Sequence, residues 1–107
     1  MQDSVIPQDP VADLVRILDL EQQSPTTFLG QTQWMPHGSV FGGQVLSQSL
    51  VAATRTLEPG RPVHSLHSYF LRPGDVAKPI EFEVDILRDG RSFSARRVQA
   101  SQEGKAI

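Results

Sequence analysis

Two glycines and a glutamine near the middle of the chain could take part in chemistry. Gly42, Gly43 and Gln44 stand where a stretch with helical spacing of apolar residues begins. Glycines at a helix start let a ligand approach the backbone, and the free N–H groups at the positive end of the helix dipole can polarise a carbonyl oxygen. Gln44 could orient a water molecule or a carbonyl group. The alternative is that the glycines only give the helix clearance and that Gln44 satisfies a neighbouring backbone group.

Two histidines, His64 and His67, lie in a run of residues that favours a β-strand. Either could act as a general base, because histidine titrates near neutral pH. They have opposite parity in a strand, so at most one faces a given pocket; the alternative is a histidine hydrogen-bonded within or beside the sheet. His37 lies in a turn and is expected to be exposed. No histidine or carboxylate stands at metal-ligand spacing, so no metal site is predicted.

Five arginines near the ends of predicted strands could bind phosphate groups. They are Arg72, Arg88, Arg91, Arg96 and Arg97. A guanidinium group binds phosphate through two parallel hydrogen bonds; the alternative is that these arginines pair across strands with acidic side chains of residues 79–88. One of Arg96 and Arg97 should point inward or towards an interface.

The sequence offers no convincing nucleophilic side chain. The chain has no cysteine and no Gly-x-Ser-x-Gly motif, so direct attack by water is favoured over a mechanism with a covalent intermediate.

A short helix is predicted over residues 9–21. Asp9 is a good N-cap residue, and Pro10 suits the first helical position. The apolar residues that recur at helical spacing are Val11, Leu14, Val15 and Leu18. This apolar face should lie against the body of the protein. Residues 1–8 are predicted to form a flexible arm.

A longer second helix is predicted over residues 43–57, after a first strand at residues 26–34. One face of this helix is apolar and consists of Leu46, Leu50, Ala53 and Leu57. No charged residue occurs from position 22 to position 54. A helix without charges on any face is usually surrounded by protein, so this helix is predicted to be buried.

Further strands are predicted over residues 63–71, 79–88 and 92–101. Residues 79–88 alternate cleanly between apolar and acidic side chains, which predicts a strand with one buried and one solvated face. Asp89-Gly90 and Glu103-Gly104 are hairpin signals, and residues 105–107 would begin one more strand. One apolar helix with such a sheet predicts an α+β hotdog fold, an antiparallel sheet wrapped around a long central helix, here possibly lacking its last strand.

Length and composition narrow the classes of function. The 107 residues amount to one domain, residues 9–107, with 38% hydrophobic and 21% charged residues and a net charge of -2. A nucleic-acid-binding protein would normally show a basic excess, so no nucleic-acid partner is predicted. The start of the chain lacks the features of a signal peptide, and no run approaches the roughly 18 apolar residues of a membrane span. These observations predict a cytoplasmic domain, and no cofactor is predicted.

Three blocks of sequence resemble the TesB-type (type II) acyl-CoA thioesterases, specifically their N-terminal hotdog half. The resemblance covers about residues 18–107. The blocks are Val40-Phe41-Gly42-Gly43-Gln44-Val45, His64-Ser65-Leu66-His67-Ser68-Tyr69-Phe70-Leu71-Arg72-Pro73-Gly74-Asp75 and Leu87-Arg88-Asp89-Gly90-Arg91-Ser92-Phe93-Ser94-Ala95-Arg96-Arg97-Val98. They keep the family's order and approximate spacing, and it is the combination that is specific.

The resemblance implies hydrolysis of fatty acyl-CoA to a free fatty acid and CoA, by a protein with two fused hotdogs of which this chain carries one. In the family the water-activating Asp, with Thr or Ser and Gln partners, belongs to the C-terminal hotdog, and no position of this chain corresponds to it. Among the residues present, His64 is favoured as a catalytic group because it opens the second block. Gly43, Gln44, Arg72 and Arg96 are predicted to contact the acyl-CoA substrate.

Two other functions remain open on the sequence. The first is a non-catalytic hotdog module that provides dimerisation and acyl-CoA binding, with the catalytic residues on the other half. The second is hydration of an enoyl-CoA, which needs an Asp/His pair in a motif that this sequence does not contain. A homo-oligomer or a pairing with a second hotdog domain is expected in any case, because the long helix and the open sheet edge need a partner.

Overall fold

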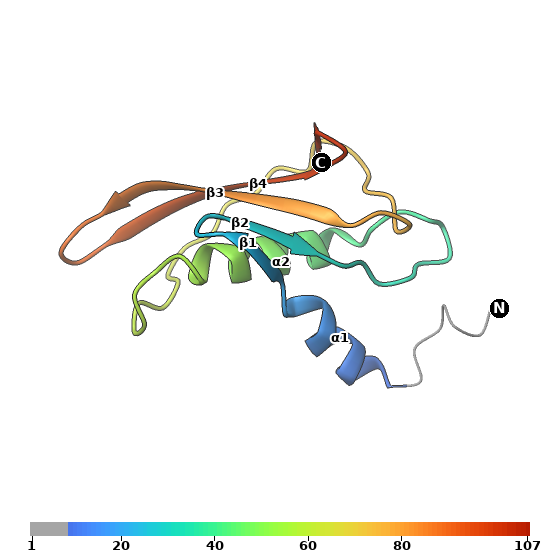
Figure 1. Ribbon diagram of the computed structural model, residues 1–107, viewed down its shortest axis with the longest axis horizontal. Coiled ribbons are helices and arrows are strands. Elements are labelled where there is room, and N and C mark those ends of the chain that lie inside the picture. Colours follow the sequence, from blue (N-terminus) through green and yellow to red (C-terminus); the bar gives the residue numbers. More distant parts are fainter. Residues whose placement is uncertain (1–8) are drawn as a thin grey trace.

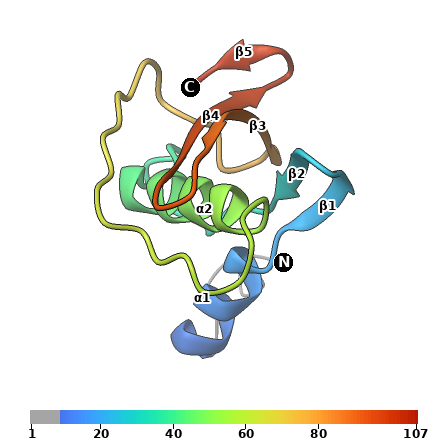
Figure 2. The same ribbon diagram turned by 90° about the vertical axis from the view of Figure 1, so that its left-hand side faces the viewer.

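The computed structural model of the chain describes residues 9–107, and the predicted arm at residues 1–8 lies outside them. Its elements are α1 (Pro10–Leu18), β1 (Glu21–Ser24), β2 (Thr27–Gly30), α2 (Gly42–Thr54), β3 (Ile80–Asp89), β4 (Ser94–Gln102) and β5 (Lys105–Ala106). The five strands form one antiparallel sheet in the order β1-β2-β3-β4-β5. The sheet curves over α2, as Figures 1 and 2 show. The predicted α+β arrangement around a long helix is therefore confirmed.

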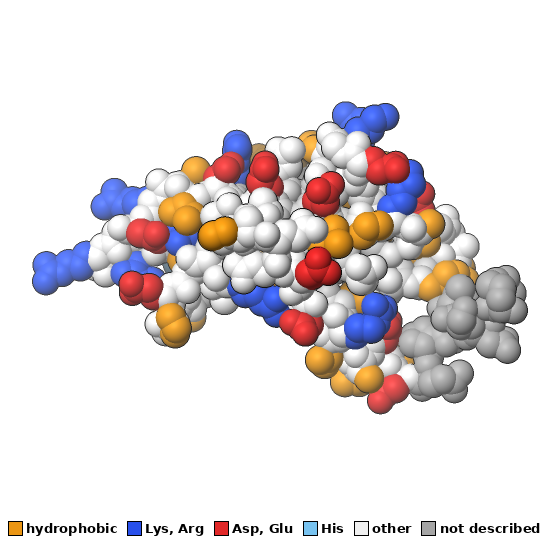
Figure 3. Space-filling model, in the orientation of Figure 1, with side chains coloured by type: hydrophobic (Ala, Val, Ile, Leu, Met, Phe, Trp, Pro, Cys, Tyr) orange, Lys and Arg blue, Asp and Glu red, His pale blue; other side chains and the backbone are white. Residues whose placement is uncertain are grey.

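Helix α1 starts where the sequence predicts but presents a different face to the protein. The Asp9 carboxylate accepts hydrogen bonds from the N–H groups of Val11 and Ala12, both at 3.1 Å. The helix ends at Leu18, because Glu21 already begins β1. Val11, Leu14 and Val15 are exposed, and Ile17 is the buried residue of the helix; apolar side chains are visible along the lower side of α1 in Figure 3.

Polar bonds explain why the prediction for the apolar face of α1 was wrong. The Asp13 carboxylate accepts a hydrogen bond from the Gln33 side chain at 3.1 Å. The Ile17 carbonyl accepts one from the Gln48 side chain at 2.9 Å. These two bonds turn the side that carries Asp13 and Ile17 towards the body, so the stripe of Val11, Leu14 and Val15 faces away from it.

The predicted single strand over residues 26–34 is replaced by the β1–β2 hairpin. The Ser24 hydroxyl accepts hydrogen bonds from the N–H groups of Thr26 and Thr27, at 3.2 and 3.1 Å, and so stabilises the turn. Strand β2 ends at Gly30. Beyond it, the Gln31 carbonyl and the Gln33 N–H bind side chains of α2, so these residues do not continue the sheet.

The predicted second helix forms as α2, but it ends at Thr54, so Leu57 lies outside it, and two of its buried residues are glutamines. Gln44, Gln48 and Ala52 are buried, whereas the predicted apolar face of Leu46, Leu50 and Ala53 is only partly buried. Glutamine is uncharged, and burial costs little when every amide atom has a partner. The side-chain N and O atoms that are buried among the described residues all have hydrogen-bond partners.

Strands β3, β4 and β5 follow the two predicted hairpins. Ile80, Phe82 and Val84 of β3 are buried, while Ile86 is 51% exposed. The β3–β4 hairpin projects past the end of α2 at this point (Figure 1), which removes the helix that would have covered Ile86. Glu103 and Gly104 have φ angles of 50° and 81°, as the two-residue turn between β4 and β5 requires.

Residues 63–71 were predicted to be a strand, and this prediction was wrong. The segment is exposed throughout and belongs to no strand of the described chain. Among residues 9–107, hydrogen bonds hold the segment only just before its start and at its last residue. Arg61 donates to the Ser94 hydroxyl at 2.7 Å, and the Leu71 N–H donates to the Ile107 carbonyl at 2.8 Å. A strand needs a backbone beside it along its length, and Ile107 reaches only the last residues.

Candidate functional site

A hollow of about 290 Å³ opens at the N-terminal end of α2. Its lining consists of Val40, Gly42, Val45, Phe70, Leu71, Arg72, Pro73, Gly74 and Ile107. Two loops are joined beside it, because Val40 N–H donates to the Gly74 carbonyl at 2.8 Å. The lining combines apolar side chains and glycines with one arginine. We call this the α2 hollow.

The start of α2 is open to this hollow. Its N-cap residue, Phe41, makes no side-chain cap hydrogen bond, so the first N–H groups of the helix are not covered by a capping side chain. A Cβ atom on Gly43 would lie 2.5 Å from the Phe41 ring, and one on Gly42 would lie 3.3 Å from the Phe70 ring. Of the two glycines, only Gly42 lines the hollow, and both leave room for an aromatic ring.

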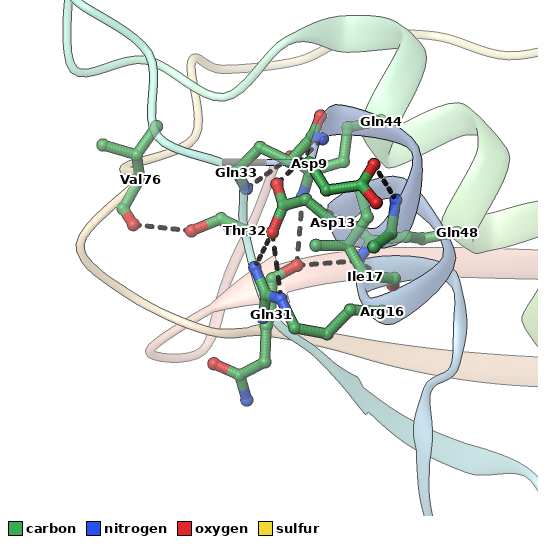
Figure 4. A network of polar contacts seen from close by, with 11 residues as sticks. Asp9, Asp13, Arg16, Ile17, Gln31, Thr32, Gln33, Gln44, Gln48 and Val76 are labelled. Atoms are coloured by element: carbon green, nitrogen blue, oxygen red, sulfur yellow. Dashed lines mark hydrogen bonds and ion pairs between the residues drawn. The ribbon is translucent and has the colours of Figure 1, made fainter. Parts of the chain in front are cut away.

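Gln44 points into the protein rather than into the hollow. Its carbonyl oxygen accepts a hydrogen bond from Gln33 N–H at 3.0 Å. Its amide nitrogen donates to the Gln31 carbonyl at 3.2 Å and to the Gln48 side-chain oxygen at 3.0 Å (Figure 4). Gln44 therefore holds the first turn of α2 against residues 31–33, which is the neighbouring-group role that the sequence left open.

Gln48 is the residue that the sequence reasoning missed. It is fully buried and donates to the carbonyls of Ile17, at 2.9 Å, and Gln31, at 2.8 Å. With Gln44 it forms a ladder that ties α2 to α1 and to the segment after β2 (Figure 4). The signal was present in the sequence, since two glutamines four apart lie on the same side of a helix that bears no charge.

Arg72 lies exposed at the rim of the hollow. Its backbone N–H donates to the Ile107 carbonyl at 3.1 Å, which fixes the base of the side chain. Within residues 9–107 its guanidinium group makes no hydrogen bond or ion pair. This group is free to meet an anionic ligand at the open end of α2.

Arg96 points inward, as one of the two adjacent arginines was predicted to do. Its side chain is 5% exposed. The guanidinium group donates to the Thr56 hydroxyl and carbonyl, at 2.7 and 3.1 Å, and to the Arg88 carbonyl at 3.2 Å. It also forms an ion pair with Asp89 at 2.9 Å. Arg96 thus fastens the end of α2 to the β3–β4 hairpin with donors that already have partners in the protein.

Two of the five arginines, Arg96 and Arg97, form ion pairs with acidic residues of β3. The Arg97 guanidinium lies 2.7 Å from Asp85, so the predicted cross-strand pairing is confirmed for this pair. Hydrogen bonds from Arg96 and then Ser94 lower the pKa of the Asp89 carboxyl below its ordinary value of 3.8. Lys and Arg side chains stand out at the left end of Figure 3, where the hairpin projects.

The histidines do not meet the α2 hollow. His64 is exposed, and its ring lies 5.5 Å from that of Phe93. His67 lies 5.0 Å from the Tyr69 ring and lines a second, larger cavity. Neither is hydrogen-bonded to a carboxylate among residues 9–107, and a catalytic role for His64 stays a prediction. His37 is exposed as expected, and its Nδ1 accepts from Ser39 N–H at 3.1 Å.

The second cavity is a groove of about 590 Å³ between α2, β4 and residues 66–71. From α2 it is lined by the predicted apolar face, Leu46, Leu50 and Ala53, and from β4 by Val98 and Ala100. We call it the α2–β4 groove.

The described part of the chain holds no cluster of three or more potential metal-ligating side chains. None of its helices has the length and apolar character of a membrane span.

Comparisons with known proteins point to one family. A family model described as "Acyl-CoA thioesterase N-terminal domain" matches residues 31–107. The chain is 42% identical over 104 residues to human acyl-coenzyme A thioesterase 8, covering 92% of this chain and 33% of that protein. The chain therefore spans about a third of the length of this curated relative.

Two solved structures share the fold and much of the sequence. A TesB protein from Mycobacterium avium subspecies paratuberculosis superimposes with a TM-score of 0.86 at 46% identity, over 90% of this chain and 39% of that one. An acyl-CoA thioesterase II from Mycobacterium marinum gives a TM-score of 0.79 at 48% identity, over 89% of this chain and 34% of that one. The predicted hotdog architecture is confirmed by these likenesses.

Proposed function

Because the chain belongs to the family of acyl-CoA thioesterase N-terminal domains, we propose that the protein hydrolyses fatty acyl-CoA to a free fatty acid and CoA. The observation that carries the proposal is the open start of α2 beside Arg72, whose guanidinium group has no partner within residues 9–107. Backbone N–H groups at a helix start favour a carbonyl oxygen that gains negative charge. Arginine binds the phosphates of CoA. The α2 hollow brings these two kinds of group together.

In the proposed complex the thioester carbonyl faces the N–H groups of Gly42 and Gly43, and the phosphates of CoA lie towards Arg72. Water attacks the carbonyl carbon, the carbon–sulfur bond breaks, and the CoA thiolate takes up a proton while the acid leaves. The N–H groups would stabilise the oxyanion of the tetrahedral intermediate. Gln44 does not contact the substrate in this arrangement. It positions the N–H groups by fixing the first turn of α2 against residues 31–33.

A second candidate is a non-catalytic module that binds acyl-CoA and pairs with another hotdog. The lining of the α2 hollow favours it, because apolar groups, glycines and an arginine bind and polarise a ligand but do not carry protons. On this alternative, residues 9–107 form one hotdog domain and the water-activating acid comes from a second one, in the same protein or another copy. For both candidate functions we propose that the protein lies in the cytoplasm.

Thiol release from acyl-CoA separates the two candidates. The chain has no cysteine, so a thiol-reactive dye reports only CoA. Hydrolysis by the chain, lost in the Gly42→Val variant, would support the enzyme. Binding of a non-hydrolysable thioether analogue without thiol release would support the module. If the chain neither binds the analogue nor releases thiol, both candidates are overturned.

Arg72→Ala is the site variant, and Arg91→Ala is its matched control. Arg91 is an exposed arginine on the hairpin, outside the α2 hollow. We expect Arg72→Ala to weaken analogue binding by about tenfold, as the loss of one charge-assisted contact predicts. The control should bind like the parent chain, and equal loss in both variants would contradict the placement of the phosphates.

A further inference from the structure

Gln102 is a buried glutamine at the end of β4, with 8% of its surface exposed. Its side-chain oxygen accepts a hydrogen bond from Asp75 N–H at 2.8 Å. Its side-chain nitrogen donates to the Asp75 carbonyl at 2.8 Å and to the Lys78 carbonyl at 3.0 Å. All three bonds therefore reach one segment that follows Arg72. We call residues 72–78 the Arg72 loop.

The Arg72 loop packs directly on the residues that lead into α2. Val40 N–H donates to the Gly74 carbonyl at 2.8 Å, and Val76 N–H donates to the Gly38 carbonyl at 3.1 Å. A Cβ atom on Gly74 would lie 2.9 Å from the Val40 side chain, so glycine permits the close approach of the two segments. The position of the loop therefore determines what stands beside the start of the helix.

Arg72 lies between two attachments of this loop to the rest of the protein. The Ile107 carbonyl accepts a hydrogen bond from the backbone N–H of Arg72 at 3.1 Å. A little further along the chain, Gln102 holds Asp75. Between them, Pro73 has a φ angle fixed by its ring. The two attachments therefore enclose the short stretch that presents the guanidinium group at the rim of the α2 hollow.

A glutamine suits this position because its amide is both a donor and an acceptor. The Asp75 N–H and the Lys78 carbonyl have no other hydrogen bond among residues 9–107. Without the amide of Gln102 these backbone groups would need water, and the loop would have to open to reach it. An ion pair of Lys78 with Glu103, at 2.6 Å, also joins the loop to the β4–β5 turn, but exposed pairs contribute little.

We propose that Gln102 is a positioning residue of the α2 hollow. Its amide holds residues 75–78 in place, and so sets where the Arg72 guanidinium lies relative to the N–H groups of Gly42 and Gly43. Gln102 does not line the hollow itself, so it acts on a ligand through Arg72. The effect on acyl-CoA binding rests on the proposed function, whereas the holding of the loop is a property of the chain without ligand.

Amide hydrogen exchange without ligand tests whether Gln102 holds the loop. Gln102→Met removes the amide and keeps an unbranched side chain of similar size; Gln99→Met is the control, at an exposed glutamine of β4 whose side chain makes no hydrogen bond within residues 9–107. Exchange at Val40 and Val76 should be about fivefold faster in Gln102→Met, as the loss of one net hydrogen bond predicts, and unchanged in the control. Slow exchange at Val84 verifies that both variants are folded. Unchanged exchange in Gln102→Met would overturn the proposal.

A double-mutant cycle with Arg72→Ala tests whether Gln102 acts through Arg72. Gln102→Met should raise the Kd of a non-hydrolysable thioether analogue by about fivefold, which lies within the roughly tenfold contribution expected of Arg72. In the Arg72→Ala background the same substitution should change the Kd by less than about twofold.

Two results of this cycle would refute the positioning role. One is an unchanged Kd in Gln102→Met, and the other is an equal rise in both backgrounds, which a merely structural role predicts. If the parent chain does not bind the analogue, the proposed function fails, and exchange at Val40 and Val76 still decides whether Gln102 holds the loop.

Discussion

Replacement of Gln48 by leucine tests the buried glutamine ladder that positions α2. Leucine has a similar volume and suits a helix, so the substitution removes hydrogen bonds without opening a large cavity. The variant loses two donated bonds, to the carbonyls of Ile17 and Gln31, and one accepted from Gln44. The bonds to the Ile17 carbonyl and from Gln44 are buried, and the bond to the Gln31 carbonyl is partly buried.

The expected loss is large for a domain of this size. Each hydrogen bond contributes about 1 kcal/mol net, and a buried group left without a partner costs about 1–3 kcal/mol. The Gln31 carbonyl keeps a bond from Gln44, so the Ile17 carbonyl and one N–H of Gln44 are the groups left unpaired. We expect the free energy of unfolding to fall by about 3 kcal/mol, equivalent to a Tm lower by roughly 12–20 °C.

Urea unfolding followed by circular dichroism measures this change. Gln23→Leu is the control, because Gln23 is an exposed glutamine of β1 whose side chain forms no hydrogen bond with any residue in 9–107. The control should change the free energy of unfolding by less than about 0.5 kcal/mol. A Gln48→Leu variant as stable as the control would refute the ladder as the element that fixes α2.

Three further predictions concern packing and charge. Gly30→Ala should destabilise the fold by about 1–3 kcal/mol in urea unfolding, because its Cβ would lie 2.8 Å from the Gln48 amide nitrogen; a neutral result would contradict this close approach. Arg96→Lys should lower Tm by roughly 8 °C or more, because lysine cannot bridge Thr56 and Asp89 together; an unchanged Tm would exclude the fastening role. The lowered pKa of Asp89 contributes stability that is present above its ordinary pKa of 3.8 and is lost as pH falls through and below that value. Asp89→Asn should flatten this acid dependence of Tm, and an identical acid profile would show that Asp89 does not contribute.

The parts of the fold that the sequence predicts are those set by neighbouring residues. The Asp9 cap, the start of α2 and the Glu103-Gly104 turn depend on a few adjacent side chains and on backbone conformation. The alternation in β3 also survives, because a strand with one buried face has period two whatever its partners are.

The errors arise where distant partners decide the outcome. Residues 63–71 have the composition of a strand, but hydrogen bonds from another backbone are needed to form one. The apolar stripe of α1 faces outward because Asp13 and Ile17 have polar partners elsewhere in the chain. Periodicity alone cannot weigh a satisfied glutamine against a leucine, so it does not predict that Gln44 and Gln48 are the buried residues of α2.

The candidate site was predicted only in part, because distant partners also decide which of its side chains are free. Gly42 and Arg72 line one hollow, because they lie at the start of α2 and in the loop that packs on it, and Gly43 follows Gly42 in the first turn of the helix. Gln44 and Arg96 have the polar chemistry that a ligand needs, yet both are engaged by the protein. His64 lies apart, since residues 63–71 are not drawn into the sheet.

Nuclear magnetic resonance of the amide groups of Gly42 and Gly43 tests the central claim most directly. Titration of the chain with a non-hydrolysable thioether analogue of acyl-CoA should shift both resonances to saturation. Arg72→Ala should raise the Kd of that transition, whereas Arg91→Ala should leave it unchanged. Saturable shifts confined to other parts of the chain, with Gly42 and Gly43 unmoved, would contradict acyl-CoA binding at the start of α2.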